Sequence, residues 1–456
     1  RGAVAAYRDH DGVLDALRAA RADAVWPGWG FVAEDAEFVE RLREAGIVFL
    51  GPSPDAMRAV GDKIAAKQLA ERAGVPVSKW NGGALADADE ALRAADDIGY
   101  PVVLKASAGG GGRGIRMVAK PGDLEAAFAS AAAEAKSAFG DGRLFVEERV
   151  VGGRHIEVQI AADLYGNVFA IGSRDCSVQR RHQKVLEEAP PPAMARELRS
   201  AIEASAVALA REVGYAGVGT VEFLVSGDRF VFLEVNPRLQ VEHGITEALT
   251  GLDLVHLQIR IARGESLEGL EIQERGVSIE ARVCAEDPDQ GFIPSPGRIA
   301  CFNPMIGSGV RVDTGVAAGT TVPGDFDSLV AKVIATADTR DAARAKLACA
   351  LRDFELVVEG GATNKGYLLE MLESPDYRRG GVDTAWLDRW SAVREAKDAG
   401  ADIALVAAGI LAYQRQRGLA RLNFYAAPTA LAAERVPPPQ GRPPRVRIRS
   451  VMGKAP

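Results

Sequence analysis

Apolar runs and amphipathic stretches alternate along the first fifty residues of the chain. Residues 11–21 have the apolar spacing of a short helix, and the run Ala24-Val25-Trp26 after it predicts a buried strand. A second helix is expected over residues 35–45 and a second strand over residues 47–50. Because strands that alternate with helices are typical of parallel sheets, this stretch predicts an α/β domain.

The next helical stretch has a clear start. Ser53 is a favourable N-cap residue, and Pro54 suits the first helical position because an N–H there would have no helical partner. The helical pattern then continues to Ala73 and is stopped by Gly74.

From residue 100 onward the pattern becomes rich in strands. Strands are expected at residues 101–105, 114–118, 144–147 and 155–160, helices at 122–138 and 194–213, a hairpin at 219–235, and a further β-rich unit at about 276–385. An alanine-rich helix at about 401–417, closed by Gly418, precedes the proline clusters 437–439 and 443–444. Proline-rich stretches of this kind form stiff, extended linkers, so we expect a further domain beyond them.

Composition narrows the class of protein. The chain has 456 residues, enough for about three domains, and 47% of them are hydrophobic, as in ordinary globular proteins. Its net charge is −7, with 55 Lys+Arg against 62 Asp+Glu, which makes it a poor general binder of nucleic acid or anionic membranes. The sequence contains no run of 18 apolar residues and no visible signal peptide. Its four cysteines are widely spaced, so we expect reduced thiols in a cytoplasmic protein.

A glycine-rich segment follows the strand expected at 101–105. Residues Ala106 to Gly114 satisfy GxGxxG, but a strand follows where a dinucleotide-binding fold needs a helix, and the Lys-Ser/Thr ending of a P-loop is absent. We interpret the segment as a β-hairpin whose bare amides cover phosphates, with Lys105 beside them. A flexible surface hairpin is the alternative.

Two acidic residues are expected to face each other in the hairpin at 219–235. If the turn lies near residue 228, Glu222 and Glu234 are equidistant from it and pair. Opposed like charges destabilise a sheet unless a cation lies between them. Two carboxylates together with the amide of Asn236 suit Mg²⁺ that is held partly by substrate phosphates. The alternatives are two exposed glutamates on a solvated face, or a register shifted by one that separates the pair.

Two polar runs supply candidate chemistry. Directly after the hairpin, Arg238 can clamp a planar anion and Glu242 is a candidate general base, although a structural ion pair is an open alternative. The other run, residues 179–184, carries three fixed positive charges and is a candidate phosphate or bicarbonate site. A solvated basic surface or a nucleic-acid patch is its alternative, and few aromatic residues interleave it. Cys176, just upstream, is expected to be a small core residue.

Taken together, these motifs resemble those of the biotin carboxylases. The matching segments are Trp26 to Phe31, Gly61 to Lys63, Lys105 to Ser107 with the glycine loop, Arg174 to Lys184, Asn236 to His243 and Phe292 to Gly297. The resemblance covers about residues 10–390. Trp26 to Gly30 and Pro76 to Trp80 are similar to the acetyl-CoA carboxylase branch, which would link the chain to fatty acid biosynthesis.

The resemblance implies an ATP-grasp fold of mixed α/β and α+β class. It implies a partial Rossmann-like N-terminal domain at 1–60, an ATP-grasp domain at 61–265 with a mobile lid at about 77–149, and a β-rich C-terminal domain at 276–390. Residues 391–456 would form a helix and a proline-rich linker toward a missing domain.

The resemblance also implies roles for individual residues. ATP would be bound by Lys63, Lys105, Gly109, Gly110, Gly111, Gly112, Gly114, Glu147, Glu148, Val150, His155, Gln179, His182, Glu222 and Glu234. Mg²⁺ or Mn²⁺ would be held by Glu222, Glu234 and Asn236. Bicarbonate would be bound by Lys184, Arg238, Gln240 and the Val241 amide, with Glu242 as the base and Arg311 stabilising a biotin enolate. The implied catalytic residues are therefore Lys184, Arg238, Glu242 and Arg311.

The implied reaction is the ATP- and bicarbonate-dependent carboxylation of biotin through carboxyphosphate, the first half-reaction of an acyl-CoA carboxylase. The Met-Lys-Met biotin acceptor is absent, so we expect the biotin carrier domain and the carboxyltransferase on a missing segment or on another chain. The strand and Gly-rich segment that usually open the family are also absent, so the N-terminal sheet is expected to be incomplete. The resemblance also implies a homodimer. Another ATP-grasp ligase, or a non-catalytic module of a multienzyme carboxylase, are the competing hypotheses.

Overall fold

The computed structural model describes residues 3–109, 114–394 and 401–426 of the chain. It divides into two units, Arg1–Arg394 and Glu395–Pro456, and each is described by itself. Gly110, Gly111 and Gly112 and the proline clusters 437–439 and 443–444 lie outside the described residues.

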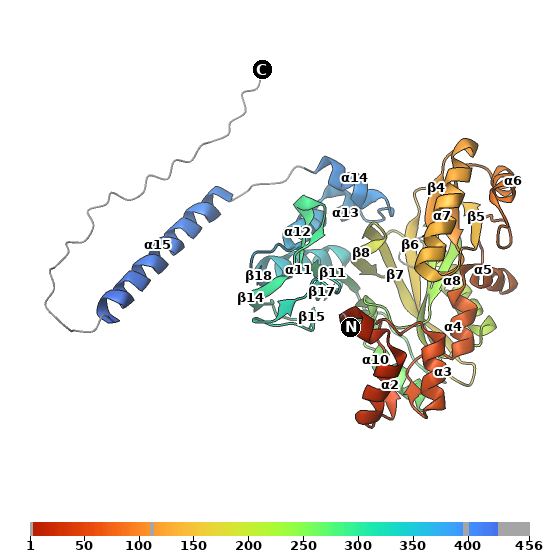
Figure 1. Ribbon diagram of the computed structural model, residues 1–456, viewed down its shortest axis with the longest axis horizontal. Helices are drawn as coiled ribbons and strands as arrows, with labels where there is room; N and C mark the ends of the chain where they lie inside the picture. Colours follow the sequence, from red (N-terminus) through yellow and green to blue (C-terminus); the bar gives the residue numbers. More distant parts are fainter. Residues whose placement is uncertain (1–2, 110–113, 395–400, 427–456) are drawn as a thin grey trace, which may run out of the picture. The chain divides into compact units, whose positions relative to one another are not determined.

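The N-terminal part of the first unit alternates helices and strands. It contains α1 (Ala3–Tyr7), α2 (His10–Ala19), β1 (Ala24–Val25), α3 (Ala36–Glu44) and β2 (Val48–Phe49), the red elements of Figure 1. β1 and β2 pair in parallel, as predicted, with Ala24 opposite Val48. Asp35 caps α3 by accepting a hydrogen bond from the Phe38 amide, and the Phe38 ring is fully buried beneath the helix.

The helical stretch expected up to Ala73 is two helices, α4 (Pro54–Gly61) and α5 (Lys63–Arg72). Ser53 caps α4 and Pro54 is its first residue, as predicted. Asp62 breaks the stretch because its backbone is extended (φ −87°, ψ 117°) and its carboxylate accepts hydrogen bonds from two amides in the first turn of α5. Asp62 is thus the N-cap of α5, and Lys63 is the first helical residue.

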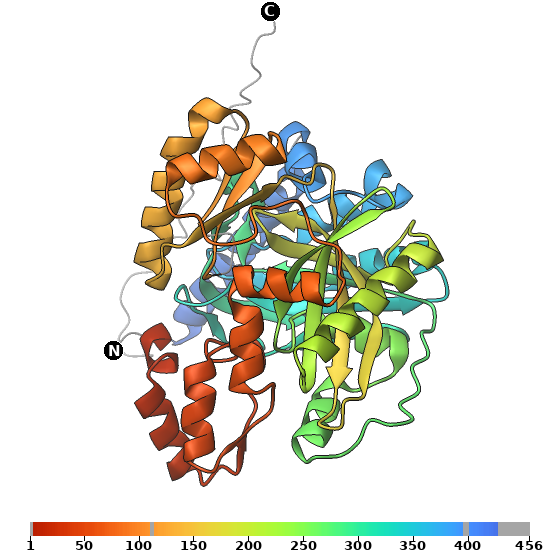
Figure 2. The same ribbon diagram turned by 90° about the vertical axis from the view of Figure 1, so that its right-hand side faces the viewer.

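A three-stranded antiparallel sheet carries the glycine loop. Its order is β4-β3-β5, and the strands are β3 (Val102–Ala106), β4 (Ile115–Val118) and β5 (Leu144–Glu148). α6 (Ala88–Ile98), which was not predicted, and α7 (Leu124–Phe139) pack together on one face, as Figure 2 shows, and a 3₁₀ turn (Pro121–Asp123) leads into α7. The other face carries Lys105 and Glu147, which pack toward the rest of the unit.

The centre of the unit is an eight-stranded sheet in the order β10-β9-β6-β7-β8-β11-β17-β15. Its strands are β6 (Arg154–Ala162), β7 (Val168–Arg180), β8 (Gln183–Ala189), β9 (Gly217–Ser226), β10 (Arg229–Asn236), β11 (Val277–Cys284), β15 (Val310–Thr314) and β17 (Leu329–Ala337). The long hairpin β7–β8 was not predicted. Its buried polar residues obscure the apolar alternation by which a strand is normally found.

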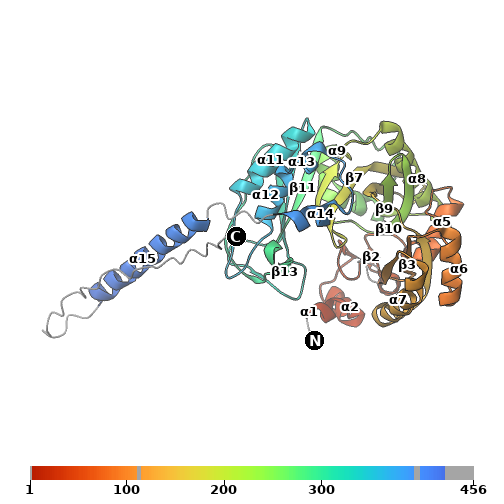
Figure 3. The ribbon, with the colours of Figure 1, turned by 90° about the horizontal axis from the view of Figure 1, so that it is seen from above.

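This sheet has one apolar and one polar face. On β6, Ile156, Val158 and Ile160 point to the apolar face, which α8 (Arg196–Glu212) covers at one end and α11 (Arg340–Asp353) at the other (Figure 3). The alternate residues Glu157 and Gln159 are also fully buried and lie on the opposite face. α9 (His243–Thr250) packs on that polar face, and α10 (Leu254–Ala262) follows it. Strand alternation therefore concentrates buried polar groups on one side of the sheet.

The β9–β10 hairpin brings Glu222 opposite Glu234, as predicted. Arg229 pairs with Ser226, so the turn is centred between residues 227 and 228 and not on residue 228 as expected. A bulge at Leu233 inserts one extra residue and brings the two glutamates into register.

The β-rich region expected at about 276–385 also contains helices. Besides β11, β15 and β17 it has β12 (Glu286–Asp287), β13 (Ile293–Pro294), β14 (Gly297–Asn303), β16 (Thr321–Val322), β18 (Glu355–Val358), a 3₁₀ turn (Pro288–Gln290), α11, α12 (Lys365–Glu373) and α13 (Pro375–Arg379), and α14 (Trp386–Val393) follows it. These elements share one apolar core that includes Leu347, Leu368 and Leu387.

The second unit contains α15 (Ala401–Ala426). The helix was expected to close at Gly418 and instead continues past it, because one glycine inside a helix costs only about 1 kcal/mol. In the part of the chain that the structure describes, no helix is both long and apolar enough to cross a membrane.

Candidate active site

A row of charged residues crosses the polar face of the eight-stranded sheet. The strand register places Glu234 opposite Glu222, Glu222 opposite Glu157, and Glu157 opposite Arg174. Directly opposed residues share a face, so three carboxylates and a guanidinium line up across four strands. Such a row is stable only if cations separate the carboxylates.

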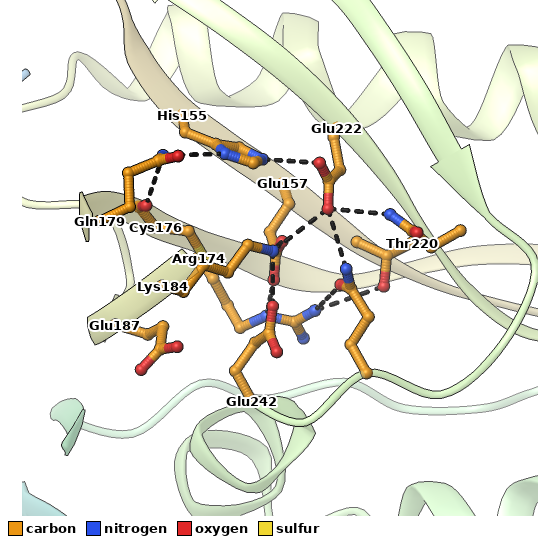
Figure 4. A network of polar contacts seen from close by, with 12 residues as sticks. His155, Glu157, Arg174, Cys176, Gln179, Lys184, Glu187, Thr220, Glu222 and Glu242 are labelled. Carbon is orange, nitrogen blue, oxygen red and sulfur yellow. Dashed lines mark hydrogen bonds and ion pairs between the residues drawn. The ribbon is translucent and has the colours of Figure 1, made fainter. Parts of the chain in front are cut away.

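Arg174 is a fully buried centre of this arrangement, as Figure 4 shows. It donates through Nε to Glu157, through Nη1 to Gln159 Oε1 (2.7 Å) and Thr246 Oγ1 (2.9 Å), and through Nη2 to Thr220 Oγ1 (3.3 Å) and Gln240 Oε1 (3.1 Å). The five N–H groups of a guanidinium can satisfy this set. Arg174 therefore fixes both Glu157 on the sheet and Gln240 in the loop after β10.

Lys184 links three buried carboxylates. Its Nζ donates to Glu157 Oε2 (2.5 Å), Glu242 Oε1 (2.6 Å) and Glu222 Oε1 (3.1 Å), the central contacts in Figure 4. One ammonium therefore joins the hairpin carboxylate Glu222 to the predicted base Glu242.

A β-bulge gives Lys184 its orientation. Gln179 pairs with Lys184, but Val178 pairs with Leu186, so Val185 is the extra residue in β8. Without the bulge, Lys184 and Glu187 would alternate to opposite faces, whereas with it both lie on the polar face.

Glu222 is ionised in this environment. Its Oε1 accepts hydrogen bonds from Asn236 Nδ2 (2.9 Å) and Gln240 Nε2 (2.8 Å), and its Oε2 lies 2.8 Å from His155 Nε2. Burial alone would raise the pKa of Glu222, but Lys184 and His155 outweigh it and hold that pKa well below its usual value. Burial lowers the pKa of His155, and the neighbouring Glu222 more than compensates, so the pKa of the imidazole is raised.

The outer end of the row meets the N-terminal elements. Lys63 Nζ donates to Glu234 Oε2 (2.8 Å), and Arg238 pairs with Glu34 through Nε (2.5 Å). Arg238 Nη2 also donates to Asn236 Oδ1 (3.3 Å). The structure thus brings Lys63 to Glu234 and Arg238 to Asn236 at this end of the row.

The donor set at this end suits a divalent cation. Glu222, Glu234 and Asn236 offer carboxylate and amide oxygens, which Mg²⁺ prefers, from two paired strands. In this structure Lys63 provides the positive charge beside Glu234, and Lys184 provides it beside Glu222. The residues therefore fit a metal ion that shares its coordination with phosphate oxygens.

Glu242 lies between two cations. Lys184 contacts its Oε1, and Arg282 Nη2 donates to its Oε2 (2.9 Å). Burial favours the neutral acid, but Lys184 and Arg282 prevail and lower the pKa of Glu242 well below its usual value. The adjacent carbonyl of Val241 accepts a hydrogen bond from Lys332 Nζ (2.6 Å). Glu242 is therefore the ionised, proton-accepting form.

Arg282, and not Arg311, contacts the predicted base. Arg282 bridges Glu242 and Glu187, to which its Nε donates at 2.6 Å. Arg311 lies two strands away on β15 and is paired with Asp313 and with Glu247 of α9. The sequence offered no signal for this difference, because each arginine is simply a charged residue on an expected strand.

A second cluster lies on the small sheet. Glu147 accepts contacts from Lys105, from Lys67 and from Ser78 Oγ (2.9 Å). Burial would raise its pKa, but Lys105 and Lys67 lower the pKa of Glu147 to about 2. Next to it, Glu148 forms two 2.8 Å hydrogen bonds with Arg229. Lys105 is thus held by β5, which ends two residues before Val150.

The remaining predicted residues surround these clusters. Gln179 Nε2 lies 3.3 Å from His155 Nδ1, whereas His182 lies at the exposed turn between β7 and β8 with φ +66°. Gly109 has φ +115°, and a side chain there would lie 2.4 Å from the Phe139 ring. Gly114 has φ +69° and lies against Ala106. Only glycine fits both ends of the loop.

The fold and this site define an ATP-grasp enzyme. Three family models match the chain in order: "Biotin carboxylase, N-terminal domain" over residues 1–57, "Carbamoyl-phosphate synthase L chain, ATP binding domain" over residues 62–270, and "Biotin carboxylase C-terminal domain" over residues 280–389. The chain belongs to the biotin carboxylase family.

Individual relatives agree with this assignment. The chain is 46% identical to biotin carboxylase 1, chloroplastic, of Populus trichocarpa, covering 83% of this chain and 72% of that protein. It is 48% identical to pyruvate carboxylase 1 of Caenorhabditis elegans, over 84% of this chain but only 33% of that protein. The chain thus spans about a third of that longer relative.

Solved structures show the same fold. The biotin carboxylase beta-gamma-ATP complex from Campylobacter jejuni is 43% identical, with a TM-score of 0.81, and the match covers 84% of this chain and 85% of that chain. The biotin carboxylase domain dimer of the Hydrogenobacter thermophilus 2-oxoglutarate carboxylase, in complex with MgADP, ADP and bicarbonate, is 39% identical. Its TM-score is 0.83, with 86% of this chain and 87% of that chain covered.

Proposed function

We propose that this chain uses ATP and bicarbonate to carboxylate biotin through carboxyphosphate. The observation that carries the proposal is Lys184, which joins the hairpin carboxylate Glu222 to the ionised base Glu242 in one buried network. A nucleotide phosphate at the first carboxylate and bicarbonate at the second would therefore lie side by side.

ATP binds at the outer end of the charged row. Lys63 and Lys105 face its phosphates, His182 reaches them from the β7–β8 turn, and the glycine loop from Gly109 to Gly114 covers them. Glu147, Glu148 and Val150 meet the adenine, and His155 and Gln179 lie toward the ribose. Glu222, Glu234 and Asn236 hold Mg²⁺ or Mn²⁺, which neutralises phosphate charge when bound.

Bicarbonate binds at the inner end. Lys184, Arg238, Gln240 and the Val241 amide contact the anion, and Glu242 takes its proton. The bound anion competes with Glu242 for Lys184, and the loss of that cation raises the pKa of Glu242 toward a value useful in a base. Support comes from the shared contacts of Lys184 and from the position of Gln240 between Arg174 and Glu222.

The reaction then follows from charge and position. The deprotonated bicarbonate oxygen attacks the γ-phosphorus, the bond to the ADP oxygen breaks, and carboxyphosphate forms. Carboxyphosphate separates into CO₂ and phosphate, the phosphate accepts the biotin N–H proton, and the nitrogen attacks CO₂. The enolate-stabilising charge is that of Arg311, as the resemblance implies, whereas Arg282 orients the base by donating to Glu242.

The division into domains is part of the proposal. An N-terminal domain at 1–60, an ATP-grasp domain at 61–265 with a lid at about 77–149, and a C-terminal domain at 276–390 agree in order with the three family matches. The acetyl-CoA carboxylase branch and the cytoplasmic location stay predictions from the sequence.

The partners are a biotin carrier domain and a carboxyltransferase, on the same longer chain or on separate subunits. The pyruvate carboxylase relative, of which this chain matches 33%, supports a fused arrangement in that protein. A homodimer is supported by the neighbour described as a biotin carboxylase domain dimer.

The test is phosphate release by the purified full chain with ATP, Mg²⁺ and bicarbonate, in the presence and absence of free biotin. We expect release that depends on biotin, and Arg238→Ala should lower it by about 10²-fold or more because it removes an anion contact. Arg298→Ala is the matched control, since Arg298 forms only an exposed pair with Glu359.

Two results would contradict the proposal. Turnover that requires ammonia or an amino acid and ignores biotin would identify another ATP-grasp ligase. ATP binding without turnover would identify a non-catalytic module of a carboxylase.

A further inference from the structure

Two buried carboxyl groups lie beside the site and have no part in the proposed reaction. Glu187 of β8 and Glu280 of β11 are directly opposite each other in the antiparallel pair, and each is 0% exposed. Directly opposed residues share a face, so both lie on the polar side of the sheet beneath α9. Two ionised carboxylates in this position would repel each other.

The pair has too few hydrogen-bond donors for two negative charges. Among the described residues, Glu187 Oε2 and both oxygens of Glu280 have no hydrogen-bond partner. Arg282 Nε donates to Glu187 Oε1 (2.6 Å) and is, within the described part of the chain, the one cation in contact with the pair. A buried carboxylate in such a setting takes up a proton.

The other neighbours do not supply the missing charge. Lys332 of β17 faces Glu280, but its Nζ is committed to Val241 O (2.6 Å) and to Asp313 Oδ2 (3.2 Å). From α9, Gly244 closes over Glu280, and a side chain there would lie 3.6 Å from Glu280 Oε2 and 3.3 Å from Asp313 Oδ2. No water-facing surface remains at either carboxyl group.

The charges around Glu187 are also accounted for. Its pKa is affected by the charges of Arg282 on β11, Glu242 in the loop before α9 and Lys184 on β8. The thiol of Cys176 on β7 also lies nearby. Burial raises the pKa of Glu187 to about 7, opposed mainly by Arg282. Burial raises the pKa of Glu280 to about 8, opposed by Lys332 and reinforced by the charge of Glu187.

We propose that Glu187 and Glu280 hold one proton between them, and that this shared acid positions Arg282 against Glu242. With Glu187 ionised and Glu280 protonated, the Arg282 guanidinium has one carboxylate on each side, Glu187 at Nε and Glu242 at Nη2. Glu280 lies two residues from Arg282 on the same strand face. When Glu280 ionises, it draws the guanidinium away from Glu242. Glu280 is thus a positioning residue that acts through Arg282.

The effect on turnover rests on the proposed function and is tested by a pH profile. Wild-type kcat should fall as the pH rises above about 8, because Glu280 loses its proton there. Glu280→Gln keeps the group neutral, so its kcat should stay within about twofold of wild type at pH 7 and lack the alkaline fall. Glu187→Gln is the contrasting variant, because it removes the ionised partner of Arg282. It should lower kcat above about pH 7, where Glu187 is ionised, and have a smaller effect at lower pH.

The protonation state itself is tested without turnover, by infrared spectroscopy of the full chain at pH 7. Wild type should show the carbonyl band of a buried protonated carboxylic acid, and Glu280→Gln should lack it.

Thermal unfolding gives a second readout. Because the folded-state pKa of about 8 exceeds the reference value of 4.5, the proton stabilises the folded chain fully below that reference, and this stabilisation is lost as the pH rises from 4.5 to about 8. The Tm of Glu280→Gln relative to wild type should therefore increase across that window.

The outcomes separate the two proposals. If the infrared band is absent from wild type, or persists in both Glu280→Gln and Glu187→Gln, the shared proton is contradicted. If the band behaves as expected but the chain does not carboxylate biotin, the proposed function fails and the shared proton stands. An unchanged alkaline fall in Glu280→Gln contradicts the positioning of Arg282 by Glu280.

Discussion

Glu242 is held by Lys184 and Arg282, and these contacts decide what it can do as a base. Both cations lower its pKa, so the carboxylate is unprotonated at neutral pH but weakly basic. An incoming anion that takes over Lys184 makes Glu242 more basic at the moment when a proton must be accepted. The protonation state of one side chain is therefore coupled to the occupancy of the pocket beside it.

The two arginines near α9 should both be needed for turnover, through different contacts. Arg282→Met should lower biotin-dependent kcat by about 10²–10³-fold, because it removes a buried charge in contact with Glu242. Arg311→Met should lower biotin-dependent kcat by about 10²-fold or more, because it removes the charge assigned to the biotin enolate, although Arg311 contacts Asp313 and Glu247 and not the base. Steady-state kinetics at saturating ATP measure both. Wild-type kcat in Arg311→Met would contradict the role of Arg311, and wild-type kcat in Arg282→Met would contradict the orienting role of Arg282.

Glu147 should make the folded chain sensitive to acid. Its pKa is about 2 in the folded protein against a reference of 4.5, so it contributes stability above pH 4.5 that is lost as the pH falls toward 2. The difference corresponds to about 3 kcal/mol at neutral pH. Urea unfolding at several pH values should show a shallower acid loss for Glu147→Gln than for wild type.

The matched control is Glu148→Gln, one residue along the strand. Glu148 pairs with Arg229 near the surface, where solvent weakens the interaction. If both variants change the acid dependence equally, the buried contacts of Glu147 with Lys67 and Lys105 are not its source.

At the scale of single residues, the sequence predicted the polar residues that a hairpin places on one face. It did not predict residues whose importance comes from a contact with a distant strand. Glu222, Glu234 and Asn236 were found because the alternation of a hairpin places them on one face. Arg282 and the pair Glu187–Glu280 were not found, since their significance comes from strands distant in the sequence.

Single extra residues adjust the elements that carry the site. The bulge at Leu233 aligns Glu222 with Glu234, and the bulge at Val185 returns Lys184 to the polar face. A bulge has no composition signal of its own, so the sequence predicted the hairpin at 219–235 but not these irregularities. The hairpin β7–β8 was missed for a related reason, because its buried face is polar.

The break between α4 and α5 is a second such feature, and it can be tested. Asp62 caps α5, accepts a hydrogen bond from Ser107 Oγ (2.8 Å) and pairs with Arg143 (2.8 Å), which ties the helix start to the glycine loop. Asp62→Ala should lower the free energy of unfolding by about 1–2 kcal/mol and raise the KM for ATP.

Asp62→Asn is the control, because asparagine caps a helix about as well as aspartate but cannot form the ion pair with Arg143. It should retain most of the stability in urea unfolding. An Asp62→Asn variant as unstable as Asp62→Ala would show that the ion pair, and not the cap, holds the two helices in place.

The whole molecule is organised around a sheet with two unlike faces. α8 and α11 bury its apolar face, which supplies the stability needed to keep a row of charges buried on the other. The sequence predicted the ATP-grasp class through its motifs, and the structural neighbours confirm that fold at TM-scores of 0.81 and 0.83. The pairing of β8 with β11, which joins the strands of the ATP-grasp and C-terminal regions into one sheet, could not be predicted from local patterns.

The most direct test of the account is the fate of labelled bicarbonate. The full chain is incubated with ATP, Mg²⁺, free biotin and radiolabelled bicarbonate, and label in carboxybiotin is compared with the ADP formed. Wild type should give the two in equal amounts, and Lys184→Met should give neither, because Lys184 joins the metal-side carboxylate to the base. ADP formed without label in biotin, or label in a different acceptor, would contradict the central claim.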